Sequence, residues 1–516
     1  MRVGQGGGGA EASNRQFLAL GALLLLLAAV VFFHLIEISS IPQGLFKDET
    51  AIGYNAWLIA RDGHDEHGHF FPLYFESSGD YKAPVYIYTV AGAFALFGPS
   101  TFVLRATSAF FFAWLLAAVA LLAYRRDPSK LMTAFVLLAG GFLPWFFTAS
   151  RISFEVISYV AIMAWVVYCQ YIAFHDSTTK NRVLPAVFCG ALLGLALYAY
   201  PTGRVTSFLY LAVLLAIAAY HHMWRPLAAL LAAFTAAIVP FAVYLFMCPS
   251  DLAGRFHHIT YVFNDNMSLA EKLKLFARNY RWHFGLQFLL LRGDHNLRHA
   301  TGQGGEVFFS VFFLAALAIG SPISLDGRWR KETFLLSLCA GLAVAPIGAA
   351  LTSEGIPHAL RSSLMGLFIL LLSFEGLRIL LRDASSAESQ RFVACVLGVL
   401  VLESATYLRG YFTDYVSQSR AASGSYGLEE SIRRALAWGP SEVLVTDKLR
   451  YTLAKFYEIV LPNPKGIRID SGPMIPARGR CLVYDPKVKP SLDASSLPSV
   501  DITMAGSLVG VRCYPR

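Results

Sequence analysis

A series of long apolar segments separated by short polar loops constrains the fold of this chain more than any other feature. Residues 18–36 are almost purely apolar and long enough, as a helix, to cross the ~30 Å hydrocarbon core of a bilayer. Further apolar runs follow at 84–97, 101–123, 131–147, 156–174, 184–198, 205–220, 227–247, 307–320, 333–350, 362–379 and 392–408. Only 15% of the residues are charged, against about 25% in soluble domains. The sequence therefore predicts a polytopic α-helical membrane protein.

The basic residues predict how the segments cross the membrane. The run 84–97 is short, which suits a helix lying at the interface rather than a span. If this run does not cross, the basic clusters at 125–130, 180–182 and 328–331 all lie on the side of the N-terminus, as the positive-inside rule requires. We therefore predict about eleven transmembrane helices, with the N-terminus cytoplasmic and the C-terminus outside. These loops account for the net charge of +9, so we expect no nucleic acid as a partner.

This topology divides the chain into a membrane part and a smaller outer part. We predict a cytoplasmic tail (1–16), a transmembrane domain (17–408) with long outer loops at 37–100 and 248–305, and an extracytoplasmic α/β domain (409–516). The outer domain has the pattern of a helix followed by short strands. It contains Cys481 and Cys513, which outside the cytoplasm can form a disulfide; two unpaired buried thiols are the alternative.

The first outer loop is rich in ionisable residues. It opens on Asp48 and Glu49, and an amphipathic helix follows, for which Asp48 is a plausible N-cap. Capping explains neither the adjacent Glu49 nor the place of this helix at a membrane surface. The later cluster HDEHGH includes His64 and His67, which are candidate ligands of a divalent metal. A solvated loop after the helix is the alternative, and it is favoured by Gly63 and the glycine at 68.

Four stretches of this loop carry a resemblance to a known family: DETAIGYNAWLIARDG (48–63), FPLYF (71–75), GDYKAPVYIY (79–88) and FGPSTFVLRATSA (97–109). They resemble the first extracytoplasmic loop of the protein O-mannosyltransferase and aminoarabinose (lipid A) transferase-like superfamily. The members are membrane glycosyltransferases of the GT-C fold, which take a sugar from a polyprenyl phosphate. The similarity continues more loosely through 151–158, 198–204, 293–305 and 357–363, and it fades in the tail. The resemblance therefore implies a GT-C fold.

The resemblance also implies catalytic residues. Asp48 of the DE motif would be the general base that takes the proton of the acceptor hydroxyl in an inverting displacement. Glu49 would orient the acceptor or raise the pKa of Asp48. Glu155 stands where the family has a second acid; for Glu155, an N-cap role or an ion pair with Arg151 is the alternative.

The lipid phosphate that leaves needs cations close to its oxygens as the bond breaks. Lys82 matches the family's lysine before proline, and the other candidates are the outer-face residues Arg204, Arg298, His299, His358 and Arg361. Some of these cations could instead bind the headgroups of membrane lipids.

The sequence thus predicts an enzyme that moves one sugar from a polyprenyl-phosphate donor to an acceptor on the extracytoplasmic face, in a bacterial inner membrane. A glycan, a lipid and a protein all remain open as the acceptor, as does the sugar itself, and no cofactor is implied beyond the metal at the HDEHGH cluster. One alternative is a ligase or polymerase that uses lipid-linked oligosaccharides, and another is a non-catalytic glycan-binding protein. A transporter is disfavoured, because transporters place ionisable residues inside their spans and these spans are almost free of charge.

Overall fold

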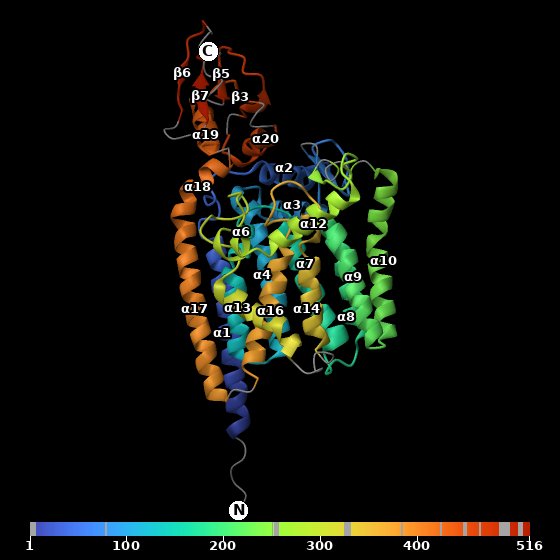
Figure 1. Cartoon of the computed structure of the whole chain (residues 1–516). Coiled ribbons are helices and arrows are strands. Elements are labelled where there is room, and N and C mark those ends of the chain that lie inside the picture. The colour runs from blue at the N-terminus through green and yellow to red at the C-terminus, as the bar shows by residue number, and fades with distance from the viewer. Residues whose placement is uncertain are drawn as a thin grey trace, which may run out of the picture.

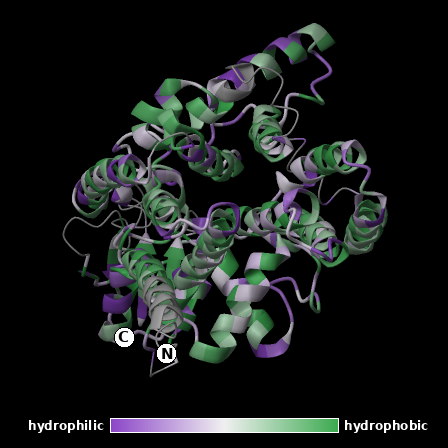
Figure 2. Cartoon of the chain, turned by 90° about the horizontal axis from the view of Figure 1, so that it is seen from below, coloured by the Kyte–Doolittle hydropathy of each residue, from purple (hydrophilic) through white to green (hydrophobic). Residues whose placement is uncertain are grey.

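Long helices that lie roughly parallel to one another form most of the molecule (Figure 1). The computed structural model describes residues 7–77, 80–249, 251, 257, 259–324, 332–382, 385–423, 426–446, 451–463, 466–484, 496–503 and 509–516. The first described turn of α1 lies at the lower end of this bundle in Figure 1, and the C-terminal strands lie beyond the upper end. Seen from below, the helices are largely hydrophobic along their ribbons (Figure 2).

Each apolar run predicted to cross the membrane coincides with helical structure. The helices are α1 (Gly7–Leu35), α4 (Thr101–Arg126), α5 (Lys130–Phe142), α6 (Pro144–Ala149), α7 (Val156–Gln170), α8 (Val183–Leu195), α9 (Gly203–Tyr220), α10 (Trp224–Met247), α13 (Phe309–Ser324), α14 (Thr333–Val344), α15 (Ile347–Ala350), α16 (Leu364–Leu380) and α17 (Ser386–Phe412). Within the described residues, six helices are long and apolar enough to cross a membrane. The protein is therefore a polytopic membrane protein, and the number eleven stays a prediction.

The bundle has a central layer and a periphery. Helices α7 and α16 are buried on nearly every side, whereas α10 and α17 expose large apolar side chains such as Phe246 and Leu402. Such surfaces suit contact with lipid tails. Two glycines allow close packing: a Cβ at Gly190 would overlap the backbone of α10, and a Cβ at Gly376 would overlap that of α13. Close contacts of this kind allow van der Waals packing to hold the helices together in a bilayer, where the hydrophobic effect does not drive them to associate.

The upper end of the bundle carries shorter elements that lie across the helix ends. They are α2 (Lys47–Asp62), the hairpin β1 (Phe75–Ser77) and β2 (Asp80–Lys82), α3 (Pro84–Phe97) and α12 (Leu269–His283) (Figure 1). The N-cap of α2 is Phe46, so the expectation that Asp48 caps this helix was wrong. Asp48 and Glu49 instead occupy its first turn, where the helix dipole favours negative charge.

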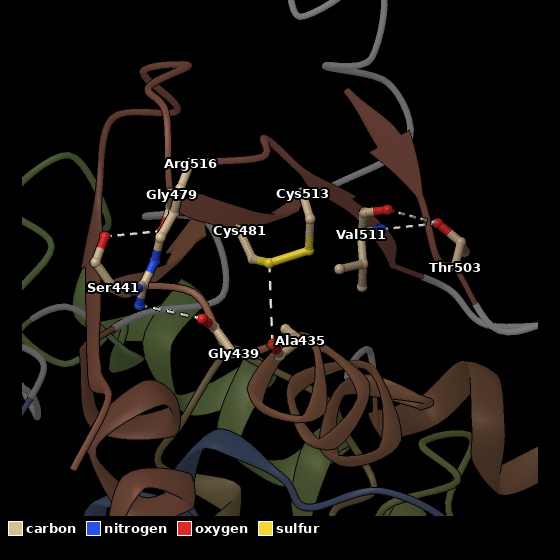
Figure 3. The surroundings of a disulfide bond; sticks show 9 residues. All are labelled: Ala435, Gly439, Ser441, Gly479, Cys481, Thr503, Val511, Cys513 and Arg516. Atoms are coloured by element: carbon tan, nitrogen blue, oxygen red, sulfur yellow. Dashed lines mark hydrogen bonds between the residues drawn. A yellow bond between two sulfur atoms is a disulfide. The ribbon is translucent and has the colours of Figure 1, made fainter. Parts of the chain in front are cut away.

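The C-terminal region contains a five-stranded sheet. Its elements are α18 (Asp414–Ser423), α19 (Leu428–Trp438), β3 (Glu442–Thr446), α20 (Tyr451–Val460), β4 (Arg468–Gly472), β5 (Arg480–Tyr484), β6 (Val500–Asp501) and β7 (Gly510–Cys513). The strand order is β4-β3-β5-β7-β6. Strand β3 is parallel to its neighbours β4 and β5, and strand β7 is antiparallel to its neighbours β5 and β6. A disulfide joins Cys481 to Cys513, which face each other across β5 and β7 (Figure 3). The alternative of two unpaired thiols is thereby excluded.

This region packs directly on the helix that carries Asp48. Helix α20 contacts α2, where the ring of Phe456 lies so close to Gly53 that any side chain at Gly53 would overlap it. The C-terminal region therefore helps to hold α2 in place.

Candidate active site

A cavity of about 490 Å³ opens at the upper end of the bundle, a size typical of small-molecule sites. Its walls come from α2, the β2 strand, the loop before α7, the start of α9 and the loops that precede α13 and α16. The lining includes nearly every predicted site residue, namely Asp48, Lys82, Glu155, Arg204, Arg298, His299, His358 and Arg361. Segments from six parts of the chain thus bring these residues together, whereas Glu49 and the candidate metal ligands His64 and His67 are not among the lining residues.

An ion pair between Asp48 and Lys82 stands at the centre of this arrangement. Lys82 Nζ donates to Asp48 Oδ1 at 2.8 Å. The side chain of Lys82 is only 8% exposed, whereas that of Asp48 is 40% exposed and open to the cavity. Burial acts to lower the pKa of Lys82, but attraction to Asp48 and Glu155 outweighs it, so the pKa is raised and the ammonium stays charged.

Glu155 completes this charged group. Its Oε1 accepts from the backbone N–H of Ala83, the residue after Lys82. Glu155 occupies the N-cap position of α7, but its side chain caps no N–H there. The guanidinium of Arg151 binds elsewhere, to Tyr411 and to backbone carbonyls that include those of His34 and Ile36. Burial raises the pKa of Glu155, Lys82 opposes this shift, and Asp48 adds to it.

Glu49 lies away from the cavity, in the protein interior. It is fully buried and forms two bonds with Arg105, from Nε to Oε1 at 2.8 Å and from Nη2 to Oε2 at 3.0 Å. The same carboxylate accepts from the backbone N–H of Phe46 and of Ser153. Glu49 therefore ties α2 to α4 and to the turn before α7. This position supports a positioning role rather than contact with an acceptor.

Arg204 has an unusual environment for a guanidinium. It lines the cavity and lies over the ring of Tyr74, 5.0 Å from the ring centre. Its Nε and Nη2 atoms are buried and make no hydrogen bond within the part of the chain that the structure describes. Buried donors without partners are costly, and an anion in the cavity would satisfy them.

The two other arginines are partly held by neighbours. Arg361 donates to Thr352 at 2.9 Å and pairs with Glu354 at 3.2 Å. Arg298 makes a long bond of 3.4 Å to Asn296, and its guanidinium lies 5.9 Å from the ring centre of Phe46. Both line the cavity, so with Lys82 and Arg204 they surround it with four cationic groups.

The two histidines of the predicted set lie together around a carboxylate. His299 Nδ1 is 3.0 Å from Asp294 Oδ2, and His358 Nδ1 is 3.9 Å from the same oxygen. The imidazole rings stack with their centres 4.5 Å apart. Burial, followed by the neighbouring His299, lowers the pKa of His358 well below its usual range. Burial therefore favours the neutral imidazole of His358, whereas a cation is expected there from the sequence.

The HDEHGH cluster is an exposed turn. His64 and His67 are exposed, and the buried Asp65 accepts from the backbone N–H groups of His67 and His69 through Oδ1, at 2.9 and 2.8 Å. Asp65 thus organises the backbone of the turn. A metal at this cluster stays a prediction.

The residues predicted from the sequence do not include Asp294, which lines the cavity beside His299. It follows Gly293 in a stretch that was identified for its arginine and histidine, and no charge pattern singled it out. Its proximity to His299 along the chain was the only available signal, because His358 comes from a loop more than 50 residues away.

Solved structures of a GT-C protein match this chain along almost its whole length, so the chain is a polytopic membrane protein with the GT-C fold. ArnT from Cupriavidus metallidurans bound to undecaprenyl phosphate matches with a TM-score of 0.58 and 14% identity, covering 96% of this chain and 99% of that one. ArnT in the apo state matches with a TM-score of 0.58 and 16% identity, covering 97% and 100%. No family model and no curated protein matches. The fold implied by the resemblance is thereby confirmed.

Proposed function

We propose that this protein is a glycosyltransferase that moves a monosaccharide from a polyprenyl-phosphate donor to an acceptor on the extracytoplasmic face of a bacterial inner membrane. The Asp48–Lys82 pair, inside a cavity with three further arginines, is the observation that carries the proposal. The cations of this arrangement suit a phosphate, and the Asp48 carboxylate suits the proton of a hydroxyl group. The matched ArnT structure is bound to undecaprenyl phosphate, which supports a polyprenyl phosphate as the ligand.

The donor phosphate would lie among Lys82, Arg204, Arg298 and Arg361. Lys82 would shift part of its hydrogen bonding from Asp48 to a phosphate oxygen, and the unpartnered nitrogens of Arg204 would donate to another. Because these cations lie in a cavity that is partly closed to water, they stabilise the charge that develops on the leaving phosphate.

Asp48 would act on the acceptor. Its carboxylate is the exposed partner of the ion pair, so it can reach an acceptor hydroxyl in the cavity. The hydroxyl oxygen attacks the anomeric carbon, the bond from that carbon to the phosphate oxygen breaks, and Asp48 takes the hydroxyl proton. One displacement of this kind inverts the anomeric configuration and releases the lipid phosphate. Glu155 would hold the segment after Lys82 through Ala83.

The test is transfer of radiolabelled sugar from polyprenyl-phosphate donors in membranes that contain the wild type or Asp48→Asn. We expect transfer in the wild type and at least a hundredfold slower transfer in Asp48→Asn, since general-base catalysis contributes about 10²–10⁴-fold. Asp62→Asn is the matched control, because Asp62 lies in the last turn of the same helix, outside the cavity lining, and its carboxylate contacts the exposed residues Arg61 and His64. Equal rates in the wild type and Asp48→Asn would remove Asp48 from the mechanism. Transfer of whole oligosaccharides would favour a ligase instead.

A further inference from the structure

Asp294, His299 and His358 form a cluster that the mechanism above does not use. All three are more than nine-tenths buried, yet all three line the cavity. One carboxylate oxygen and one nitrogen from each imidazole lie within 4.8 Å of one another. Among the described residues, this is the only group of three or more such side chains that converges in this way.

The distances are close to those of a metal site. Three ligands about 2.1 Å from a tetrahedral ion lie roughly 3.4 Å from one another. The two histidine nitrogens lie 3.0 and 3.9 Å from Asp294 Oδ2, on either side of that value. The carboxylate is already oriented, because Asn296 N–H donates to Oδ1 and Ala359 N–H to Oδ2, both at 2.8 Å. Such outer hydrogen bonds are typical of metal-binding carboxylates.

From these observations we propose that Asp294, His299 and His358 bind a divalent transition metal, with Zn²⁺ the ion of choice. Two imidazoles and one carboxylate suit Zn²⁺ far better than Mg²⁺ or Ca²⁺, which prefer all-oxygen sites. Three protein ligands leave a fourth position, and because the cluster lines the cavity, that position faces it.

The charges around the cluster indicate what occupies this position. Arg298 and Arg361 line the same cavity, so a bare cation here is partly repelled, and a bound anion removes that repulsion. If the proposed function holds, the fourth ligand is an oxygen of the donor phosphate. The metal would then add a Lewis acid on the side of the leaving group.

The test is the zinc content of the full-length protein in detergent, which needs no donor and therefore does not depend on the proposed transfer. Chelator-treated protein is loaded with Zn²⁺, passed through a desalting column and measured by mass spectrometry. We expect about one zinc per chain in the wild type and less than a tenth of that in His299→Gln and His358→Gln. His295→Gln is the matched control, because His295 is exposed and next to Asp294 but outside the cavity lining. A His64→Gln/His67→Gln variant removes two exposed histidines of the HDEHGH cluster and should keep its zinc.

A spectroscopic measurement on the wild type covers the case in which the variants do not fold. Co²⁺ in place of Zn²⁺ should give visible absorption bands of a four-coordinate site with nitrogen ligands, and these bands should shift when inorganic phosphate is added. A wild type without stoichiometric metal, equal zinc in His299→Gln and the wild type, or loss of zinc only in the His64/His67 variant would each overturn the proposal.

Discussion

Neutralising Glu49 should destabilise the protein far more than neutralising its neighbour Asp48. In Glu49→Gln, the side-chain oxygen can still accept two of the four hydrogen bonds, but the new NH₂ group faces two donors, Arg105 Nη2 and the N–H of Phe46. Arg105 then stays buried as an uncompensated charge, which costs about 3–5 kcal/mol. The carbonyls of Ile38, Pro42 and Gly44 still accept hydrogen bonds from Arg105. We therefore expect Glu49→Gln to lower the free energy of unfolding by about 3 kcal/mol, the lower end of that range.

Asp48→Asn should cost less than about 1 kcal/mol, because Asp48 is 40% exposed and Lys82 keeps the attraction of Glu155. The assay is the free energy of unfolding in detergent for both variants and for Glu49→Gln/Arg105→Met, which leaves no buried charge unpaired. The double variant should recover part of the loss of Glu49→Gln. Equal losses in Glu49→Gln and Asp48→Asn would refute the distinction between a buried structural acid and an exposed functional one.

Three further predictions follow from the contacts around the cavity. Arg204→Gln should raise the KM for the donor about tenfold or more, since a hydrogen bond to a charged group contributes about 1.5–3 kcal/mol. Arg204→Lys should reverse part of that rise in KM. An unchanged KM in Arg204→Gln would contradict this role. Because the pKa of Glu155 is raised in the folded state, its contribution to stability is present at low pH and is lost as pH rises through that raised pKa, above the usual glutamate range. In thermal melts from pH 4 to 8, the Tm of Glu155→Gln should therefore fall less with rising pH than the Tm of the wild type. Gly53→Ala should lower the free energy of unfolding by about 1–3 kcal/mol because the new methyl group overlaps Phe456, and the additional change Phe456→Leu should relieve it.

The sequence predicted the members of the site better than their surroundings. In a chain with so few charges, the polar residues of the outer loops have few places to gather, and Lys82, Arg204 and Arg361 all line one cavity. The sequence could not predict which of them already have partners: Arg361 pairs with a carboxylate, whereas two buried nitrogens of Arg204 have no hydrogen-bond partner among the described residues. That difference depends on loops that are distant in sequence.

The pair Asp48-Glu49 shows how two acids that are adjacent in sequence come to lie in different surroundings. Successive residues of an α-helix point roughly 100° apart, so two neighbours in one turn can have different surroundings. Here Asp48 faces the cavity, while Glu49 faces Arg105 and fixes the turn at Ser153. Under the proposed function, the DE motif would combine two tasks in consecutive residues: Asp48 lines the cavity and would take the proton, while Glu49 holds the helix that presents it. Backbone contacts likewise fix the Asp294 carboxylate, because the N–H groups of Asn296 and Ala359 donate to it and orient it toward the two histidines.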